Sequence, residues 1–122
     1  MQAMVIDDSK ATRLILARML NELGLEVAHA ANGRDALDQL EQGLEPGLFL
    51  VDWNMPEMSG IEFVEAVRRA PFESSARIVM VTTETEAPQM IQALEAGADE
   101  YVMKPFTKES IFSKLRLLGL EI

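Results

Sequence analysis

Several residue types that define whole classes of functional site are missing or scarce in this chain of 122 residues. Cysteine is absent, which excludes disulfides, thiolate nucleophiles and cysteine-ligated zinc or iron–sulfur centres. His29 is the only histidine, so a histidine-rich metal site is not expected. No apolar run exceeds four residues, and the first residues lack the pattern of a signal peptide. We therefore expect a cytoplasmic protein.

Basic residues are also few. Lys and Arg number 11 against 20 Asp and Glu, which gives a net charge of −9, and the bases stand singly or in pairs, as at Arg68 and Arg69. A chain of this charge repels nucleic acid and anionic membranes, so neither is an expected partner. The excess of acid instead fits metal binding or a basic protein partner. Apolar residues make up 48%, which is the composition of an ordinary globular domain.

Two patterns alternate along the chain. Short apolar runs, typical of buried strands, occur at residues 3–6, 48–51 and 78–81, with weaker candidates at 26–30 and 100–103. Helical spacing lies between them, carried by Leu16, Met19, Leu20 and Leu23, by Leu37, Leu40 and Leu44, by Ile61, Val64 and Val67, by Ala87, Met90, Ile91 and Leu94, and by Ile111, Leu115 and Leu118. Five β-α repeats predict an α/β fold, a five-stranded parallel sheet with helices on both faces.

Polar residues gather where the predicted strands end. Ligands of such folds bind beyond the carboxyl ends of the parallel strands, so these positions form the candidate site. The residues are Asp7 and Asp8 after the first strand, Asp52 and Asn54 after the third, Thr82, Thr83 and Glu84 at the fourth, and Lys104 after the fifth. No glycine-rich phosphate loop accompanies them, so a Rossmann or P-loop nucleotide site is not supported.

Most of these residues also have a purely structural interpretation. An acid after a strand often caps the next helix, and Asp8 or Ser9 could cap the first helix here. Thr82 suits a strand end, and Lys104 suits a solvated surface. Asp52 is different, because it directly follows four apolar residues, and an unpaired charge beside the core is costly.

Taken together, the residues have a coherent chemistry. Carboxylates packed side by side repel one another, and a divalent cation such as Mg²⁺, which prefers oxygen ligands, relieves that repulsion. A carboxylate can also attack phosphorus to form an aspartyl phosphate, whose oxygens need positive charge and hydrogen-bond donors. Lys104 could supply the charge and Thr82 a hydroxyl. The pattern therefore predicts a Mg²⁺-assisted phosphoryl acceptor.

Four motifs, in order and one at each of four strand ends, resemble those of one family. They are Asp7-Asp8-Ser9, the run from Asp52 to Gly60 (DWNMPEMSG), Thr82-Thr83-Glu84, and the run from Tyr101 to Phe106 (YVMKPF). On these motifs the chain resembles, over essentially its whole length, the receiver domain of bacterial two-component response regulators, most of all the CheY-like single-domain type. The resemblance implies a (βα)5 flavodoxin-like fold with strand order 2-1-3-4-5 and a phosphorylation-dependent signalling switch.

The resemblance also implies roles for individual residues in a phosphorelay. Asp52 would accept the phosphoryl group from a phosphohistidine on a sensor histidine kinase. Mg²⁺ would be held mainly by Asp8, by Asp7 largely through water, by Asp52 and by the backbone carbonyl of Asn54. Lys104 would pair with the phosphoryl group.

Two further residues would carry the switch. Thr82 would move to hydrogen-bond the phosphoryl group, and Tyr101 would turn inward into the vacated space. That shift would rearrange the face made by the fourth helix, fifth strand and fifth helix, where a downstream protein target would bind. The Lys104–Pro105 peptide bond would be cis.

Two signals about the lifetime of the phosphoryl group conflict. The residue after the switch threonine is generally small in this family, whereas Thr83 is larger and β-branched, which predicts restricted access to the phosphoryl group. Asn54 and Glu84 match positions where regulators with quick self-dephosphorylation carry the same residue types. The lifetime therefore stays open.

Three functions of other classes are alternatives to a phosphorylation switch. A small Mg²⁺-dependent phosphatase would use Asp52 as its nucleophile, although Asn54 stands where such enzymes usually have a general acid. A flavin carrier of this fold would need a phosphate loop that is missing after the first strand. A receiver that has lost phosphorylation would serve as a docking module.

The main expectation is a single receiver domain over residues 1–122, because the chain begins just before the first strand and ends just after the fifth helix. It would not be an enzyme with an external substrate. It would be a monomer, or a dimer when phosphorylated, and chemotaxis is a candidate pathway.

Overall fold

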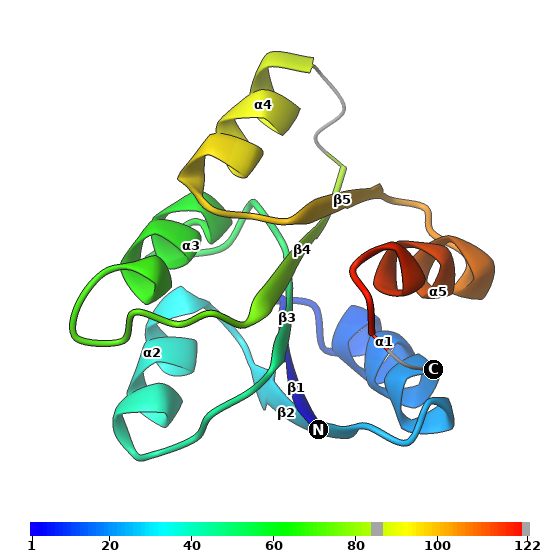
Figure 1. Cartoon of the computed structure of the whole chain (residues 1–122), viewed down its shortest axis with the longest axis horizontal. Coiled ribbons are helices and arrows are strands. Elements are labelled where there is room, and N and C mark those ends of the chain that lie inside the picture. Colours follow the sequence, from blue (N-terminus) through cyan, green and yellow to red (C-terminus); the bar gives the residue numbers. More distant parts are fainter. Residues whose placement is uncertain (84–86, 121–122) are drawn as a thin grey trace.

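The computed structural model of the chain describes residues 1–83 and 87–120, in which strands and helices alternate (Figure 1). The strands are β1 (Gln2–Ile6), β2 (Glu26–Ala30), β3 (Leu48–Val51), β4 (Arg77–Thr82) and β5 (Glu100–Met103). The helices are α1 (Lys10–Glu22), α2 (Gly33–Glu41), α3 (Gly60–Arg68), α4 (Ala87–Ala96) and α5 (Lys108–Leu117). All five predicted strand runs lie in strands, and all five predicted helical patterns lie in helices except for their last members Leu23, Leu44 and Leu118, which follow the helix ends.

The strands form one parallel sheet in the order β2-β1-β3-β4-β5, which confirms the predicted order. In its centre, Val51 at the end of β3 lies opposite Ile6 of β1 and Met80 of β4. The carboxyl ends of these three strands therefore meet at one edge of the sheet. We call this edge the carboxyl edge, and the opposite one, where the strands begin, the amino edge.

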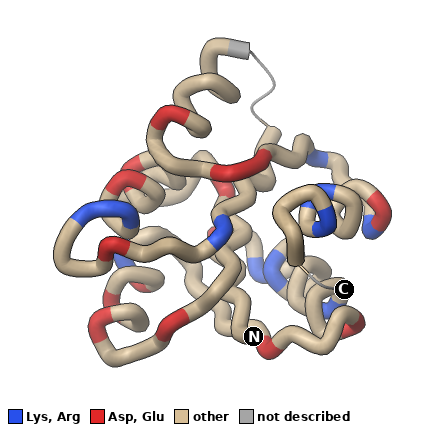
Figure 2. The backbone as a smooth tube through the Cα atoms, viewed as in Figure 1, with Lys and Arg blue, Asp and Glu red and all other residues tan. Residues whose placement is uncertain are grey.

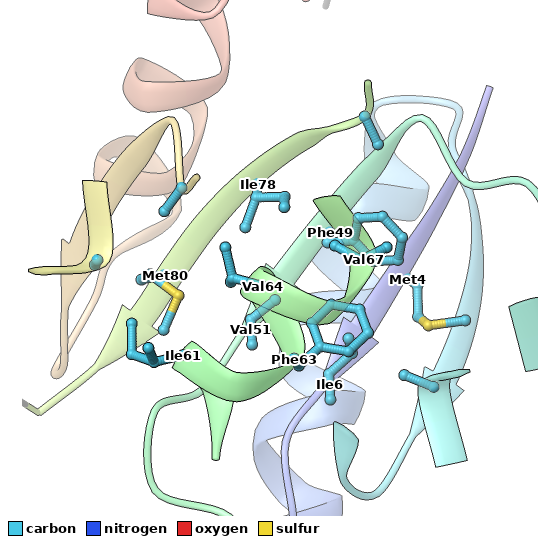
Figure 3. Close-up of a cluster of buried hydrophobic side chains, with 14 of the residues drawn as sticks. Met4, Ile6, Phe49, Val51, Ile61, Phe63, Val64, Val67, Ile78 and Met80 are labelled. Carbon is cyan, nitrogen blue, oxygen red and sulfur yellow. The ribbon is translucent and has the colours of Figure 1, made fainter. Parts of the chain in front are cut away.

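Two hydrophobic clusters hold the helices to the two faces of the sheet. One face packs against α2, α3 and α4, and the other packs against α1 and α5 (Figure 1). In the first cluster the rings of Phe49 and Phe63 meet edge to face, with centroids 5.3 Å apart (Figure 3). All four residues of β3 are buried, as a strand covered on both faces requires.

Local signals set the ends of the helices that frame the site. Ser9, one of the two predicted caps, accepts a hydrogen bond from Thr12 N at 3.2 Å and begins α1. Ser59 and Glu62 form a reciprocal capping box at the start of α3. Leu44 was predicted to continue the second helix, but α2 ends at Glu41. Gly43, at φ 104°, ends the turn that follows α2. Leu44 lies in the segment after this turn and packs against the core from there.

Acidic positions are distributed over the helices and the connecting segments, and Lys and Arg positions lie among them (Figure 2). Among the residues that the structure describes, no helix has the length and apolarity that a membrane span requires.

Candidate functional site

The backbone of the sheet places the predicted site residues at the carboxyl edge. Each of three residues donates its backbone N–H to the last residue of a neighbouring strand. Asp7 bonds to the carbonyl oxygen of Ala30 at 3.1 Å, Asp52 to that of Ile6 at 2.9 Å, and Lys104 to that of Thr82 at 2.8 Å. The backbones of Asp7, Asp52 and Lys104 therefore extend the hydrogen-bond ladder one residue beyond the strands.

The three predicted acids come together at this edge. One carboxylate oxygen from each of Asp7, Asp8 and Asp52 lies within 4.8 Å of the other two. Asp7 is only 2% exposed and Asp52 8%, whereas Asp8 is exposed. Two buried carboxylates and one solvated carboxylate thus share one small space.

Lys104 is the cation of this cluster. Its Nζ lies 3.0 Å from Asp7 Oδ2 and 3.6 Å from Asp52 Oδ1. Among the ion pairs of the described residues, no other reaches these acids, so one ammonium pairs with two of the three carboxylates. Backbone N–H groups add partial compensation, from Ser9 to Asp7 Oδ1 and from Trp53 to Asp52 Oδ1, each at 2.8 Å.

The electrostatic result is visible at Asp52. Burial, followed by repulsion from Asp7, raises the pKa of its carboxyl above the ordinary value of an aspartate. The nearby Lys104 ammonium and the Trp53 N–H act in the opposite direction, and Asp8 adds a smaller repulsion. At Asp52, burial and the neighbouring carboxylates therefore outweigh the Lys104 ammonium and the Trp53 N–H.

This donor set fits a small divalent cation. All three side chains offer hard carboxylate oxygens, and their mutual distances allow them to share one ion. Asp8 is open to solvent, so an ion bound there could keep several of its waters, as Mg²⁺ generally does. The predicted acidic metal cluster is therefore present in the geometry.

The other predicted residues surround this cluster. Thr82 is the last residue of β4 and is fully buried, while Asn54 and Thr83 are exposed beside the site. The Lys104–Pro105 peptide bond is cis, as the family resemblance implied. Glu84, predicted to influence dephosphorylation, lies outside the described residues.

Tyr101 of β5 already points into the protein. Its side chain is 6% exposed and belongs to the hydrophobic cluster that packs against α2, α3 and α4. This is the inward orientation that the resemblance associated with the phosphorylated state. That phosphorylation turns Tyr101 inward stays a prediction. The question it raises is how often the side chain already adopts this orientation without a phosphoryl group.

Two residues that sequence reasoning gave no role also shape the site. The Arg13 guanidinium on α1 donates to the backbone carbonyl of Asp7. A Cβ on Gly60, the first residue of α3, would overlap the backbone carbonyl oxygen of Asp52. The glycine was visible in the DWNMPEMSG run, but the close approach that requires it depends on how α3 docks.

Comparison with known proteins agrees with this geometry. A family model described as the response regulator receiver domain matches residues 3–116. Chemotaxis protein CheY1 of Helicobacter pylori is 37% identical over 119 residues, which cover 97% of this chain and 96% of the relative. A chemotaxis protein CheY homolog of Campylobacter jejuni is 40% identical over 116 residues, covering 94% and 89%.

A solved structure gives the same result for the fold. The chemotaxis response regulator CheY4 of Vibrio cholerae superposes with a TM-score of 0.87 at 34% identity, over 96% of this chain and 97% of that one. These comparisons give no support to the phosphatase alternative. The chain therefore belongs to the response regulator receiver domains, which are phosphorylation-dependent switches of two-component signalling rather than enzymes that turn over a substrate.

Proposed function

We propose that Asp52 is the residue that receives the phosphoryl group, from a phosphohistidine on a sensor histidine kinase. The observation that carries this proposal is the cluster of Asp7, Asp8 and Asp52 beside the Lys104 ammonium, in which Asp52 directly follows the buried strand β3. In the transfer, a carboxylate oxygen of Asp52 forms a bond to phosphorus while the phosphorus–nitrogen bond of the donor breaks. The electron pair of that bond stays on the departing imidazole nitrogen.

Each acid has a part in holding the cofactor of this reaction. Mg²⁺ would be bound by Asp8, by Asp7, by Asp52 and by the backbone carbonyl of Asn54. When bound, the ion supplies positive charge to the phosphoryl oxygens. Lys104 supplies a second positive charge from the protein, because its Nζ already lies 3.6 Å from Asp52 Oδ1.

The switch follows from what the new charge does to Lys104 and Thr82. A phosphoryl group adds nearly two negative charges beside Asp52, which draws the Lys104 ammonium and the Thr82 hydroxyl towards it. These two residues join the ends of β4 and β5 through the backbone bond from Lys104 N to Thr82 O at 2.8 Å. Any shift there reaches Tyr101 on β5, and with it the face formed by α4, β5 and α5.

That face is the proposed binding site of the downstream protein target. Because the relatives that match over nearly the full chain are named chemotaxis proteins, we propose a chemotaxis pathway in the cytoplasm. The phosphoryl group would be lost by self-hydrolysis, at a rate set in part by Asn54, Thr83 and Glu84, without turnover of an external substrate.

Trp53 offers a direct test, because it is the only tryptophan and its backbone N–H bonds to Asp52 Oδ1. We would titrate Mg²⁺ against its fluorescence and then add acetyl phosphate or phosphoramidate. The proposal predicts one change on Mg²⁺ binding and a second change on addition of the donor. Asp52→Asn should lose the second change, whereas Asp38→Asn, the same replacement at an exposed position of α2, should keep both.

Two results would contradict the proposal. One is a donor response that survives in Asp52→Asn, because the phosphoryl group would then reside elsewhere. The other is steady turnover of p-nitrophenyl phosphate that depends on Asp52, which would favour the phosphatase.

A further inference from the structure

The loop that follows the proposed phosphorylation site rests on the first residue of α2. This loop spans residues 53–59 and carries Asn54, whose backbone carbonyl is a proposed Mg²⁺ ligand. The half-buried side chain of Met58 lies over Gly33, which is itself buried. A Cβ on Gly33 would lie 2.8 Å from Met58 Sδ, 2.9 Å from Cγ and 3.2 Å from Cβ. The two residues therefore fit together only because position 33 has no side chain.

The backbone does not explain the glycine at this position. Gly24 and Gly43 have φ angles of 84° and 104°, in the region that favours glycine, but Gly33 is an ordinary residue of the first turn of α2. Glycine is among the poorest helix formers, so alanine would suit the helix better. The requirement for glycine comes from the space that Met58 occupies.

Displacing Met58 would displace the loop, because the loop is a compact unit. Met58 N donates to the carbonyl oxygen of Pro56 at 2.7 Å, and Gly60 N donates to that of Trp53 at 2.8 Å. Glu57 between them has a φ of 68°, a conformation that few residues other than glycine adopt. Rotation of the Met58 side chain cannot relieve the whole overlap, since its Cβ is also in tight contact. After the Met58 side chain has rotated, Met58 Cβ and position 33 would still have to separate by a few tenths of an ångström.

We infer that Gly33 and Met58 are positioning residues that fix the loop of residues 53–59 in the geometry required for Mg²⁺ binding and phosphorylation. The inference rests on the proposed function. Neither residue touches the reacting atoms; both act through the backbone that carries Asn54. Groups that orient metal ligands without touching the ion commonly change metal affinity when they are replaced.

The test is Mg²⁺ affinity, measured through Trp53 fluorescence. Gly33→Ala should raise the Mg²⁺ dissociation constant by about tenfold. Gly47→Ala is the matched control, because a Cβ there would also meet a methionine, Met1 Cγ at 3.2 Å, but at the amino edge of the sheet. This control should leave the dissociation constant unchanged.

A double-mutant cycle separates the contact from a general effect on folding. Met58→Ala alone should weaken Mg²⁺ binding, Met58→Leu should largely preserve it, and Gly33→Ala should have little further effect when added to Met58→Ala. If Gly33→Ala fails to fold, the comparison of Met58→Ala with Met58→Leu still tests the inference.

The outcomes distinguish the inference from the proposed function. If the wild type shows no response to Mg²⁺, the proposed function fails and the inference fails with it. If the wild type responds but Met58→Ala and Gly33→Ala bind Mg²⁺ as the wild type does, the inference alone is overturned. It is also overturned if Gly33→Ala weakens binding equally with and without the Met58 side chain.

Discussion

The two edges of the sheet differ in how completely their charged side chains are paired. At the amino edge, Asp99 Oδ2 accepts hydrogen bonds from Arg68 at 3.0 Å and from Ile78 N at 2.8 Å, and Arg77 lies 3.8 Å from Oδ1. The Arg68 guanidinium also donates to the carbonyl oxygens of Ser74, Ala76 and Gly97. At the carboxyl edge, three carboxylates lie together, and one ammonium, that of Lys104, pairs with two of them, Asp7 and Asp52.

The contrast separates a structural network from a functional one. Around Arg68 and Asp99, every charge meets opposite charge or backbone groups, and the network joins α3, β4 and the loop before β5. Around Asp52, the negative charge of Asp7 is not fully offset. Together with burial, it raises the pKa of the Asp52 carboxyl. A site that is incomplete without an ion or a phosphoryl group can respond to either, whereas a complete network contributes only stability.

The largest effect should come from breaking the amino-edge network. Arg68→Ala removes five hydrogen bonds and leaves Asp99 and three backbone carbonyls short of partners. The free energy of unfolding should fall by about 3 kcal/mol. Urea unfolding measures this change, with the exposed neighbour Arg69→Ala as the control that should lose little. Equal losses in the two variants would show that the network is not what stabilises this edge.

The same replacement at the two edges should change stability in opposite directions. In buffer without divalent ions, Asp52→Asn should raise the free energy of unfolding by about 1 kcal/mol, because it removes a buried charge that Asp7 repels. Asp99→Asn should lower it by about 2 kcal/mol, because it weakens the pairing with Arg68. A loss of stability in both variants would contradict the contrast between the edges.

Mg²⁺ should stabilise the protein only through the carboxyl edge. At ten times its dissociation constant, the ion should add about 1.4 kcal/mol to the free energy of unfolding of the wild type. Asp8→Asn should lose most of this gain and Arg77→Ala should retain it, as thermal melts with and without EDTA would show. An equal gain in Asp8→Asn would place the ion elsewhere.

The smallest effect concerns the lifetime of the phosphoryl group. Thr83 is exposed directly after the buried Thr82, and we propose that its β-branched side chain narrows access to the phosphoryl group. Thr83→Ala should speed dephosphorylation roughly two- to fivefold, equivalent to about 0.4–1 kcal/mol of barrier. The decay of Trp53 fluorescence after removal of the donor measures the rate. An unchanged decay would mean that Thr83 does not limit access.

Much of the fold was readable from the sequence, because its signals are local. The runs at residues 48–51 and 78–81 are apolar throughout, as strands covered on both faces must be, and the glycines after α1 and α4 marked where these helices end. The site followed from topology, since residues after parallel strands must share one edge. The cis bond before Pro105 came only from the family resemblance.

The remaining features depend on contacts between distant parts of the chain. The sequence analysis gave Arg68 no structural role, because its partner Asp99 is 31 residues away. It did not single out Gly33, because Met58 comes from another element. Leu44 kept helical spacing although Gly43 ended the helix. Periodicity gives the faces of elements but not which side chains will meet.

The most direct test is the intact mass of the protein after incubation with acetyl phosphate and Mg²⁺. The account predicts that the wild type and Arg77→Ala each gain a single phosphoryl group, and that neither Asp52→Asn nor metal-free wild type gains one. A phosphoryl group on Asp52→Asn, or its absence from the wild type when Mg²⁺ is bound and both acetyl phosphate and phosphoramidate are supplied, would contradict the assignment of Asp52 as the acceptor.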